Sequence, residues 1–259
     1  MARRHSGVAV GGNRRRVSGV QAVVTPPLAW DASSVNFHGA NHSGSSASQP
    51  SSTFTPPGGA VLVITAISFS NVSQADFTPP PSITDNLGTP LTYTAGPKYD
   101  ATQSDGIGIG IFTWWAYVGA TSPGAMAVTV TINLGGGQDL DWITVAVDVW
   151  DNALTTGPFG ASANAFLTNT QDLTVDLTPT AKGSAMMLAA EDAINLGAVA
   201  AGTGCYLVAN TGGASSGEVW AGTSSGPVLT TSLSPVALAM VMASTGSYPG
   251  YLAYEVLAA

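Results

Sequence analysis

A catalytic serine is the first chemistry that the sequence suggests. Residues 213–217 spell Gly-Ala-Ser-Ser-Gly and match Gly-x-Ser-x-Gly, the turn that presents the nucleophile in many hydrolases. That chemistry needs a helix after the serine and a histidine later in the chain. The three histidines, His5, His38 and His42, all lie far upstream, and no helical pattern follows the motif. Because the chain is rich in glycine and serine, we interpret the match as a loop.

Metal binding and sugar hydrolysis are the next possibilities. His38 and His42 have the spacing of a zinc pair, but their segment is typical of a loop and no third ligand is near. Paired carboxylates could serve a glycosidase or hold calcium, and four lie close together: Asp139, Asp141, Asp148 and Asp151. Solvation at strand ends explains these carboxylates equally well. We therefore predict no catalytic residue, no cofactor and no metal site.

Aromatic residues offer a third kind of site. Trp114, Trp115 and Tyr117 lie within four positions of each other, and Trp142 and Trp150 follow. Rings of this kind can stack on the faces of sugars, which makes Trp114, Trp115 and Tyr117 a candidate glycan platform. Alternating aromatic residues on a central strand more often fill a core. The platform therefore stands as an alternative to core packing.

Positive charge is concentrated at the N-terminus. Five of the seven cationic residues lie in the first sixteen positions, namely Arg3, Arg4, Arg14, Arg15 and Arg16. Only Lys98 and Lys182 follow, against fifteen carboxylates. The arginines could neutralise nucleic acid phosphates or dock into an acidic neighbouring subunit. Because the acidic remainder would be repelled by nucleic acid, we favour docking and consider nucleic acid an improbable partner.

The composition excludes several classes of protein. Charged residues make up 8% of the chain, against about 25% in ordinary soluble domains, and Ser, Thr, Asn and Gly replace them. An apolar share of 45% argues against intrinsic disorder. No apolar run approaches the length of a membrane span, and the N-terminus lacks the apolar core of a signal peptide. The single cysteine, Cys205, excludes an internal disulfide.

Alternating apolar residues predict strands through most of the chain after residue 60. Residues 61–69 are apolar on both faces and predict a central strand. Further strands are predicted at 91–94, 106–118, 125–134, 140–150, 173–177, 185–191, 205–209, 218–221, 228–231, 236–243 and 251–257. We find no sustained helical period and no repeat of fixed length. The sequence therefore predicts an all-β, antiparallel β-sandwich that is jelly-roll-like. Residues 1–59 are predicted to form an extended basic and Ser-rich N-terminal arm, and residues 60–259 the sandwich domain.

The order of several motifs resembles a known module. The segments are Ile83–Gly88 with an Asp-Asn-Leu-Gly turn, Leu91–Tyr93, Thr113–Val118, Ala127–Thr131 and Ile143–Val147. Together they resemble a β-sandwich module of minor tail proteins from long-tailed bacteriophages of actinobacterial hosts. One departure is that the glutamate usual after the last of these strands is here Asp148 or Asp151. The resemblance implies a virion structural role, often with host-surface contact, and supplies no catalytic residues.

These observations lead to one expected function. The protein is expected to be a non-enzymatic minor tail protein at the phage tail tip, docked through its N-terminal arm on other virion proteins. Virion appendages commonly have closed rotational symmetry, so a homo-oligomer is expected, with a trimer as the guess. A host cell-surface glycan is a possible ligand, and no membrane contact is expected. A capsid decoration protein and a carbohydrate-binding module are the alternatives.

Overall fold

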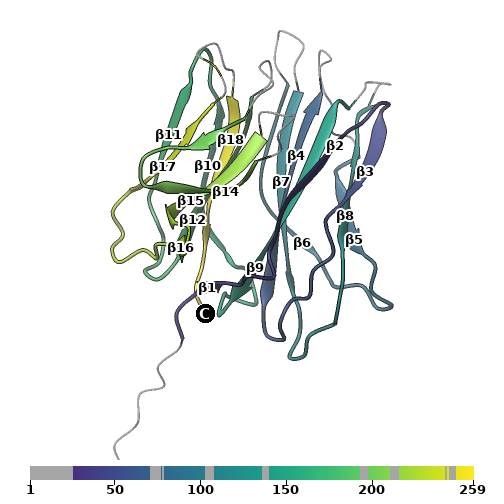
Figure 1. Cartoon of the computed structure of the whole chain (residues 1–259), viewed down its shortest axis with the longest axis vertical. Helices are drawn as coiled ribbons and strands as arrows, with labels where there is room; N and C mark the ends of the chain where they lie inside the picture. The colour runs from purple at the N-terminus through teal and green to yellow at the C-terminus, as the bar shows by residue number, and fades with distance from the viewer. Residues whose placement is uncertain are drawn as a thin grey trace, which may run out of the picture.

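The computed structural model describes residues 26–70, 77, 79–102, 108–135, 140–192, 198–210, 216–242, 244 and 249–259. The described residues form four layers of antiparallel β-sheet (Figure 1). The predicted docking residues Arg3, Arg4, Arg14, Arg15 and Arg16 lie outside the described residues.

The strands fall into two sets along the chain. The first set is β1 (Ala29–Trp30), β2 (Val35–Asn41), β3 (Ser46–Pro50), β4 (Val61–Ser70), β5 (Ser82–Asp85), β6 (Thr94–Thr102), β7 (Gly108–Tyr117), β8 (Val128–Asn133) and β9 (Trp142–Asp151). The second set is β10 (Phe159–Phe166), β11 (Asp172–Leu177), β12 (Ala185–Asp192), β13 (Ala200–Ala201), β14 (Cys205–Asn210), β15 (Ser216–Thr223), β16 (Gly226–Pro227), β17 (Val236–Val241) and β18 (Pro249–Val256).

Each set folds into its own jelly roll. In the first unit, inner sheet 1 has the order β2-β9-β4-β7-β6, with β1 also on β9, and outer sheet 1 has the order β3-β8-β5. Early strands thus pair with late ones, β2 with β9, β3 with β8 and β4 with β7. This nested antiparallel pairing defines a jelly roll. The predicted all-β, antiparallel and jelly-roll-like fold is confirmed.

The second unit repeats the strand order of the first, apart from the short strands β1 and β16. Inner sheet 2 has the order β10-β18-β12-β15-β14, with β16 on β15, and outer sheet 2 has the order β11-β17-β13. Replacing β2 by β10, β4 by β12, β7 by β15 and β9 by β18 turns one inner sheet into the other. The chain therefore contains two copies of one topology, although the sequence analysis found no repeat.

Single residues confirm the correspondence. Gly59 and Gly183 precede β4 and β12 with nearly the same left-handed φ, 89° and 83°. In each unit, the residue four positions after this glycine lies opposite a tryptophan on the neighbouring strand. Val63 pairs with Trp115, and Met187 pairs with Trp220. A register shift interrupts both edge strands, in β6 after Ala95 and in β14 after Leu207. Turn, core and bulge are thus shared by the two units.

The two units pack through their inner sheets. Strand β4 lies against its own counterpart β12, while β6 lies against β10 and β2 against β14. Such reciprocal contacts are those of an isologous, two-fold interface, here within one chain. Trp30 of the first unit contacts Trp220 of the second edge-on, with ring centroids 5.1 Å apart. The layer between the inner sheets is one continuous apolar core, and a second and third core lie under the outer sheets.

Burial explains the pattern of residues in each layer. Strands β4 and β12 are buried along both faces, because each lies between two other layers. Strands β8 and β11 belong to the outer sheets and alternate strictly between buried and more accessible positions. The double-faced apolar pattern of residues 61–69 therefore identified a central strand correctly.

The predicted division of the chain needs correction. The described part of the predicted arm, residues 26–59, is built into the first jelly roll, because β2 pairs with β9 and β3 with β8. Phe54 also bridges Met126 and is buried. Hydrogen bonding and apolar burial of this segment complete the first sandwich. The predicted boundary after residue 59 thus falls inside a unit, and residues 60–259 span two sandwiches.

Because the core between the inner sheets is shared, we expect the units to unfold together. Met187→Ala removes a fully buried side chain from that core and should cost about 2–5 kcal/mol of unfolding free energy. Val228→Ala, at a position that is 61% exposed, should change it by less than about 0.5 kcal/mol. Denaturant titration followed by circular dichroism and tryptophan fluorescence should show one coincident transition in each protein. Two separated transitions, with only one displaced by Met187→Ala, would contradict a shared core.

Candidate functional site

An open groove lies at one edge of the first unit. Inner sheet 1 extends to β6, whereas outer sheet 1 has only three strands and packs at its other edge against β2 and β9. The outer sheet therefore does not cover the part of β6 and β7 that faces it. The segment that leads into β5 partly fills the gap with Phe77, Pro80 and Pro81. The result is a cavity of about 250 Å³ that opens to solvent.

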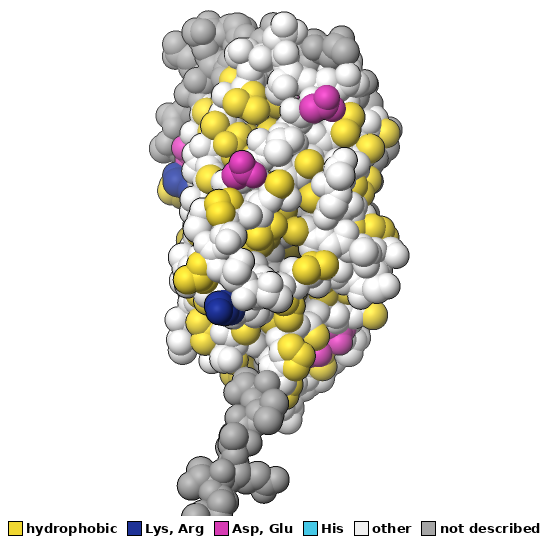
Figure 2. All heavy atoms as spheres, turned by 90° about the vertical axis from the view of Figure 1, so that its left-hand side faces the viewer, with side chains coloured by type: hydrophobic (Ala, Val, Ile, Leu, Met, Phe, Trp, Pro, Cys, Tyr) yellow, Lys and Arg dark blue, Asp and Glu magenta, His cyan; other side chains and the backbone are white. Residues whose placement is uncertain are grey.

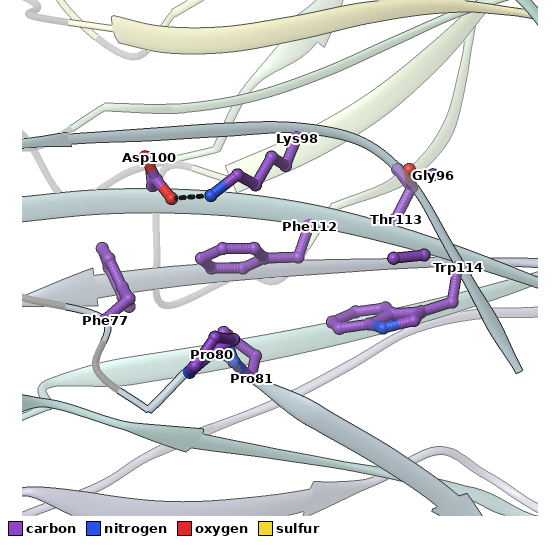
Figure 3. A pocket seen from close by; sticks show the side chains of 10 residues that line it. Phe77, Pro80, Pro81, Gly96, Lys98, Asp100, Phe112, Thr113 and Trp114 are labelled. Atoms are coloured by element: carbon purple, nitrogen blue, oxygen red, sulfur yellow. Dashed lines mark hydrogen bonds and ion pairs between the residues drawn. The ribbon is translucent and has the colours of Figure 1, made fainter.

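Aromatic side chains form the base of the groove (Figure 3). Phe112 and Trp114 project from the same face of β7, with ring centroids 6.2 Å apart. Phe77 meets Phe112 edge-on, with centroids 5.2 Å apart. Pro80 and Pro81 lie across from Trp114 (Figure 3). The base is therefore a strip of rings that is held in place by the packing of the first unit.

An ion pair lies at the rim of the groove. Lys98 Nζ is 2.5 Å from Asp100 Oδ2, and the two side chains are 62% and 38% exposed. Both come from β6, two positions apart, so they project to the same side of the strand. Figure 3 shows the pair stretched along β6 beside the Phe112 ring. The rim thus presents an ammonium donor and a carboxylate acceptor that neutralise each other.

The second unit has no such groove residues at equivalent positions. Ala66 and Ala190 are corresponding residues of the two units. Phe112 pairs with Ala66 and Gly217 pairs with Ala190, so Gly217 stands at the position of Phe112. By the same alignment Trp114 corresponds to Val219, which is fully buried under outer sheet 2. Lys98 corresponds to Asn210, since each pairs with the counterpart residue on the neighbouring strand. The rings and the ion pair are therefore features of the first unit and are not demanded by the shared fold.

The predicted aromatic platform is divided between two faces. Trp114 is 7% exposed and packs in the core under outer sheet 1, with one side of its ring in the groove. Trp115 points to the opposite face and packs partly buried against the core between the units. Tyr117 shares that opposite face and is 40% exposed. Because neighbouring residues of a strand alternate between faces, the structure does not bring the three rings together.

The other sequence motifs give no assembled site among the described residues. Residues 213–215 of the serine motif and Asp139 lie outside the described residues, and Ser216 begins strand β15 rather than a helix. His42 Nε2 lies 3.3 Å from Gln49 Oε1. Within the described ranges no three His, Cys, Asp or Glu side chains gather as metal ligands. In the same ranges no helix is long and apolar enough to cross a membrane.

Asp148 has a partner that the sequence analysis missed. It faces Glu218 of the second unit across the central core, close enough for a hydrogen bond between the two carboxyl groups. Such a bond needs a proton on one of the two groups. Trp30 Nε1 donates to Asp148 Oδ1 at 3.2 Å, and the Tyr254 hydroxyl donates to Glu218 Oε1 at 2.5 Å. Thr65 Oγ1 also donates to Glu218 Oε1, at 3.2 Å.

Burial controls the ionisation of this acid pair. It raises the pKa of Asp148 to about 6 despite the hydrogen bonds from Trp30 and Glu218. Burial, together with the charge of Asp148, raises the pKa of Glu218 well above its usual value. Both side chains are within 1% of complete burial. A substrate has no access to them, so the pair bonds the two units together and has the geometry of a structural contact.

The pKa of Glu255, which like Glu218 belongs to the second unit, is shifted in the opposite direction. Burial alone would raise the pKa of Glu255, but hydrogen bonds from Ser184, Thr180 and the Ala161 amide outweigh it and lower the pKa. The Thr180 and Ala181 amides both donate to this carboxylate. Glu255 therefore holds the turn before β12 as an ionised acceptor, whereas Glu218 is held as a neutral acid.

No protein-family model matches the chain, and neither the curated proteins nor the solved structures contain a significant match.

The residues of the groove were mostly missed by the sequence analysis. Trp114 was named, but Phe77, Lys98, Asp100 and Phe112 were not. Two signals pointed to them: Lys98 is one of only two lysines in the chain, and Phe77 stands just before a run of three prolines. Neither signal shows that β6 and the segment before β5 meet, because the strand order places them together.

The acid pair predicts an unusual dependence of stability on pH. Because the folded pKa of Glu218 is raised, its favourable contribution is complete below its unfolded pKa and is lost as pH rises through the folded pKa. Glu218→Gln keeps an acceptor for Tyr254 and a donor for Asp148 without a titrating proton. We expect the variant to be more stable than wild type at pH 8, where the buried wild-type pair is driven to lose its proton. That gain should vanish near pH 4.

Glu255→Gln is the matched control for this experiment. Since the folded pKa of Glu255 is lowered, its contribution is present above the unfolded pKa and is lost in acid. The control should therefore be less stable than wild type at pH 8. Urea titrations of the three proteins between pH 4 and 8 measure both effects, and a Glu218→Gln variant that is destabilised at pH 8 would contradict the shared proton.

Proposed function

We propose that the protein is a structural component of a phage virion, a minor tail protein at the tail tip. The observation that carries the proposal is the division of charge along the chain. Five arginines precede a remainder that has only Lys98 and Lys182 as cations and all fifteen carboxylates. A basic segment ahead of an acidic folded part suits docking onto an acidic neighbour, by electrostatic complementarity. The partners would be other virion proteins, in a homo-oligomer for which a trimer is the expected symmetry.

The architecture supports a structural role. Two jelly rolls share one continuous core, which makes a rigid block rather than two hinged modules. Figure 2 shows the face of outer sheet 2, where hydrophobic and uncharged polar side chains predominate and charged ones are few. A surface with little charge loses little solvation when it is covered by another protein. The acid pair at the centre is buried, so it supports a role in stability.

Docking through the N-terminus leads to a deletion experiment. Removal of residues 2–20 eliminates the five arginines and touches none of the described strands. We expect the truncated protein to keep the circular dichroism spectrum and the melting temperature of the full chain. We also expect it to be lost from purified particles when it replaces the full chain during infection. Normal incorporation of the truncated protein would overturn the docking role.

The location in the particle can be tested directly. Antibodies raised against the isolated chain, applied to purified particles with a gold label, should mark the tail tip. Label over the head would instead identify a capsid decoration protein. Protein that is absent from particles and free in the lysate would overturn the virion proposal altogether.

A further inference from the structure

We infer that the groove between β6, β7 and the segment before β5 is a binding site for an uncharged saccharide. The inference deepens the host-contact part of the proposed function and rests on it for its biological meaning. The binding itself is a property of the isolated chain.

The base of the groove has the chemistry that a sugar ring needs. A pyranose presents C–H groups on its faces, and these pack on the negative face of an aromatic ring. Phe112 and Trp114 lie side by side on β7 and line the groove with the parts of their rings that the core leaves uncovered, the two residues being 4% and 7% exposed. A rigid ring loses little conformational entropy when a ligand binds. The base therefore favours a ligand with a flat, weakly polar face.

The rim selects for a neutral ligand. A saccharide hydroxyl both donates and accepts hydrogen bonds, and the rim supplies Lys98 as a donor and Asp100 as an acceptor. Lys98 and Asp100 are already paired with each other. An anionic ligand would therefore have to displace Asp100 from Lys98, and a cationic ligand would have to displace Lys98 from Asp100. A hydroxyl can instead contact either member while the pair remains intact. Their exposure shows that both are accessible to a ligand.

The size of the groove limits the part of the ligand that enters it. Pockets for drug-sized molecules usually enclose about 300–1,000 Å³, whereas this one encloses about 250 Å³. It therefore fits one or two sugar rings, as the end or a side branch of a longer glycan.

Comparison of the two units supports a function for the groove. The second unit forms the same sheet order with Gly217 and Val219 at the positions of Phe112 and Trp114. The jelly roll is therefore complete without the rings, and the ion pair has no counterpart either. Aromatic residues beside an exposed ion pair, in one unit only, are explained by a ligand that binds to that unit.

The test is binding of the full chain to immobilised saccharides. The probes are neutral hexose oligosaccharides, uronic acid oligosaccharides as anionic counterparts, and a proline-rich peptide, since aromatic grooves also bind polyproline helices. We expect binding to neutral members alone, with little dependence on salt. A blank result with the neutral probes, binding to uronic acids alone or binding to the peptide alone would each overturn the inference.

Variants locate the binding site. Lys98→Ala combined with Asp100→Ala changes two exposed side chains and should weaken the affinity for the neutral probe at least tenfold. Lys182→Ala combined with Asp176→Ala makes the same change of charge in the second unit and should leave the affinity unchanged. Trp114→Val installs the residue of the second unit and should abolish binding, while Trp115→Val, on the opposite face, should not. The reverse pattern for the two tryptophans would overturn the assignment of the groove.

The two proposals fail in distinguishable ways. Glycan binding by a protein that gold labelling does not find on particles would leave the groove intact and remove the virion role. Label at the tail tip together with a blank saccharide array would leave the virion role and remove the groove.

Discussion

The apolar layer between the two inner sheets is the constraint on which the rest of the molecule depends. Each inner sheet is covered over most of one face by its own outer sheet and on the other face by the inner sheet of the other unit. Strands in such a position have no solvent face on which a charged residue could be placed without cost. A large part of the chain lies in these strands. The low content of charged residues is therefore a physical consequence of stacking four sheets.

Two buried acidic residues within that apolar layer lie together in one polar cluster. Asp148 and Glu218 come from opposite units, and each is hydrogen-bonded by a neighbour, Trp30 or Tyr254. The alignment of the units matches Asp148 with Tyr254, since they pair with the corresponding residues Val63 and Met187. The polar cluster is thus asymmetric although the frame is symmetric. A slip of either strand by one residue would turn its polar group to the other face, so the cluster favours one register of the interface.

The sequence predicted the strands of the inner sheets better than the arrangement of the units. Residues 61–69 and 140–150 carry long apolar patterns, and both are central strands. Strand β10 was missed, because Phe159–Phe166 consists of small and polar residues that alternate weakly. The segment with β2 and β3 was assigned to an arm for the same reason. Those strands are stabilised by pairing with β8 and β9, which local composition does not show.

The duplication, the groove and the acid pair could not be predicted from the sequence, for related reasons. Corresponding positions keep their burial but seldom their identity, as Trp114 and Val219 show. A periodic search for equal residues therefore finds nothing, whereas the order of strands shows the repeat at once. The partner of Asp148 lies 70 positions away on β15 and cannot be found by spacing. Contacts made by sheet packing depend on topology, so residue patterns within single strands do not contain them.

Joining two jelly rolls in one chain has a consequence that a homodimer of the same unit would not have. In a symmetric dimer, each substitution appears twice, so a groove on one subunit would also weaken the packing at the same place on the other. Here the second unit has Gly217 and Val219 on β15, which outer sheet 2 contacts through β17, while the first has Phe112 and Trp114 beside the groove. One unit can then preserve the packing that holds the block together while the other is free to change for binding. The asymmetry of the groove and that of the buried acid pair both follow from this freedom.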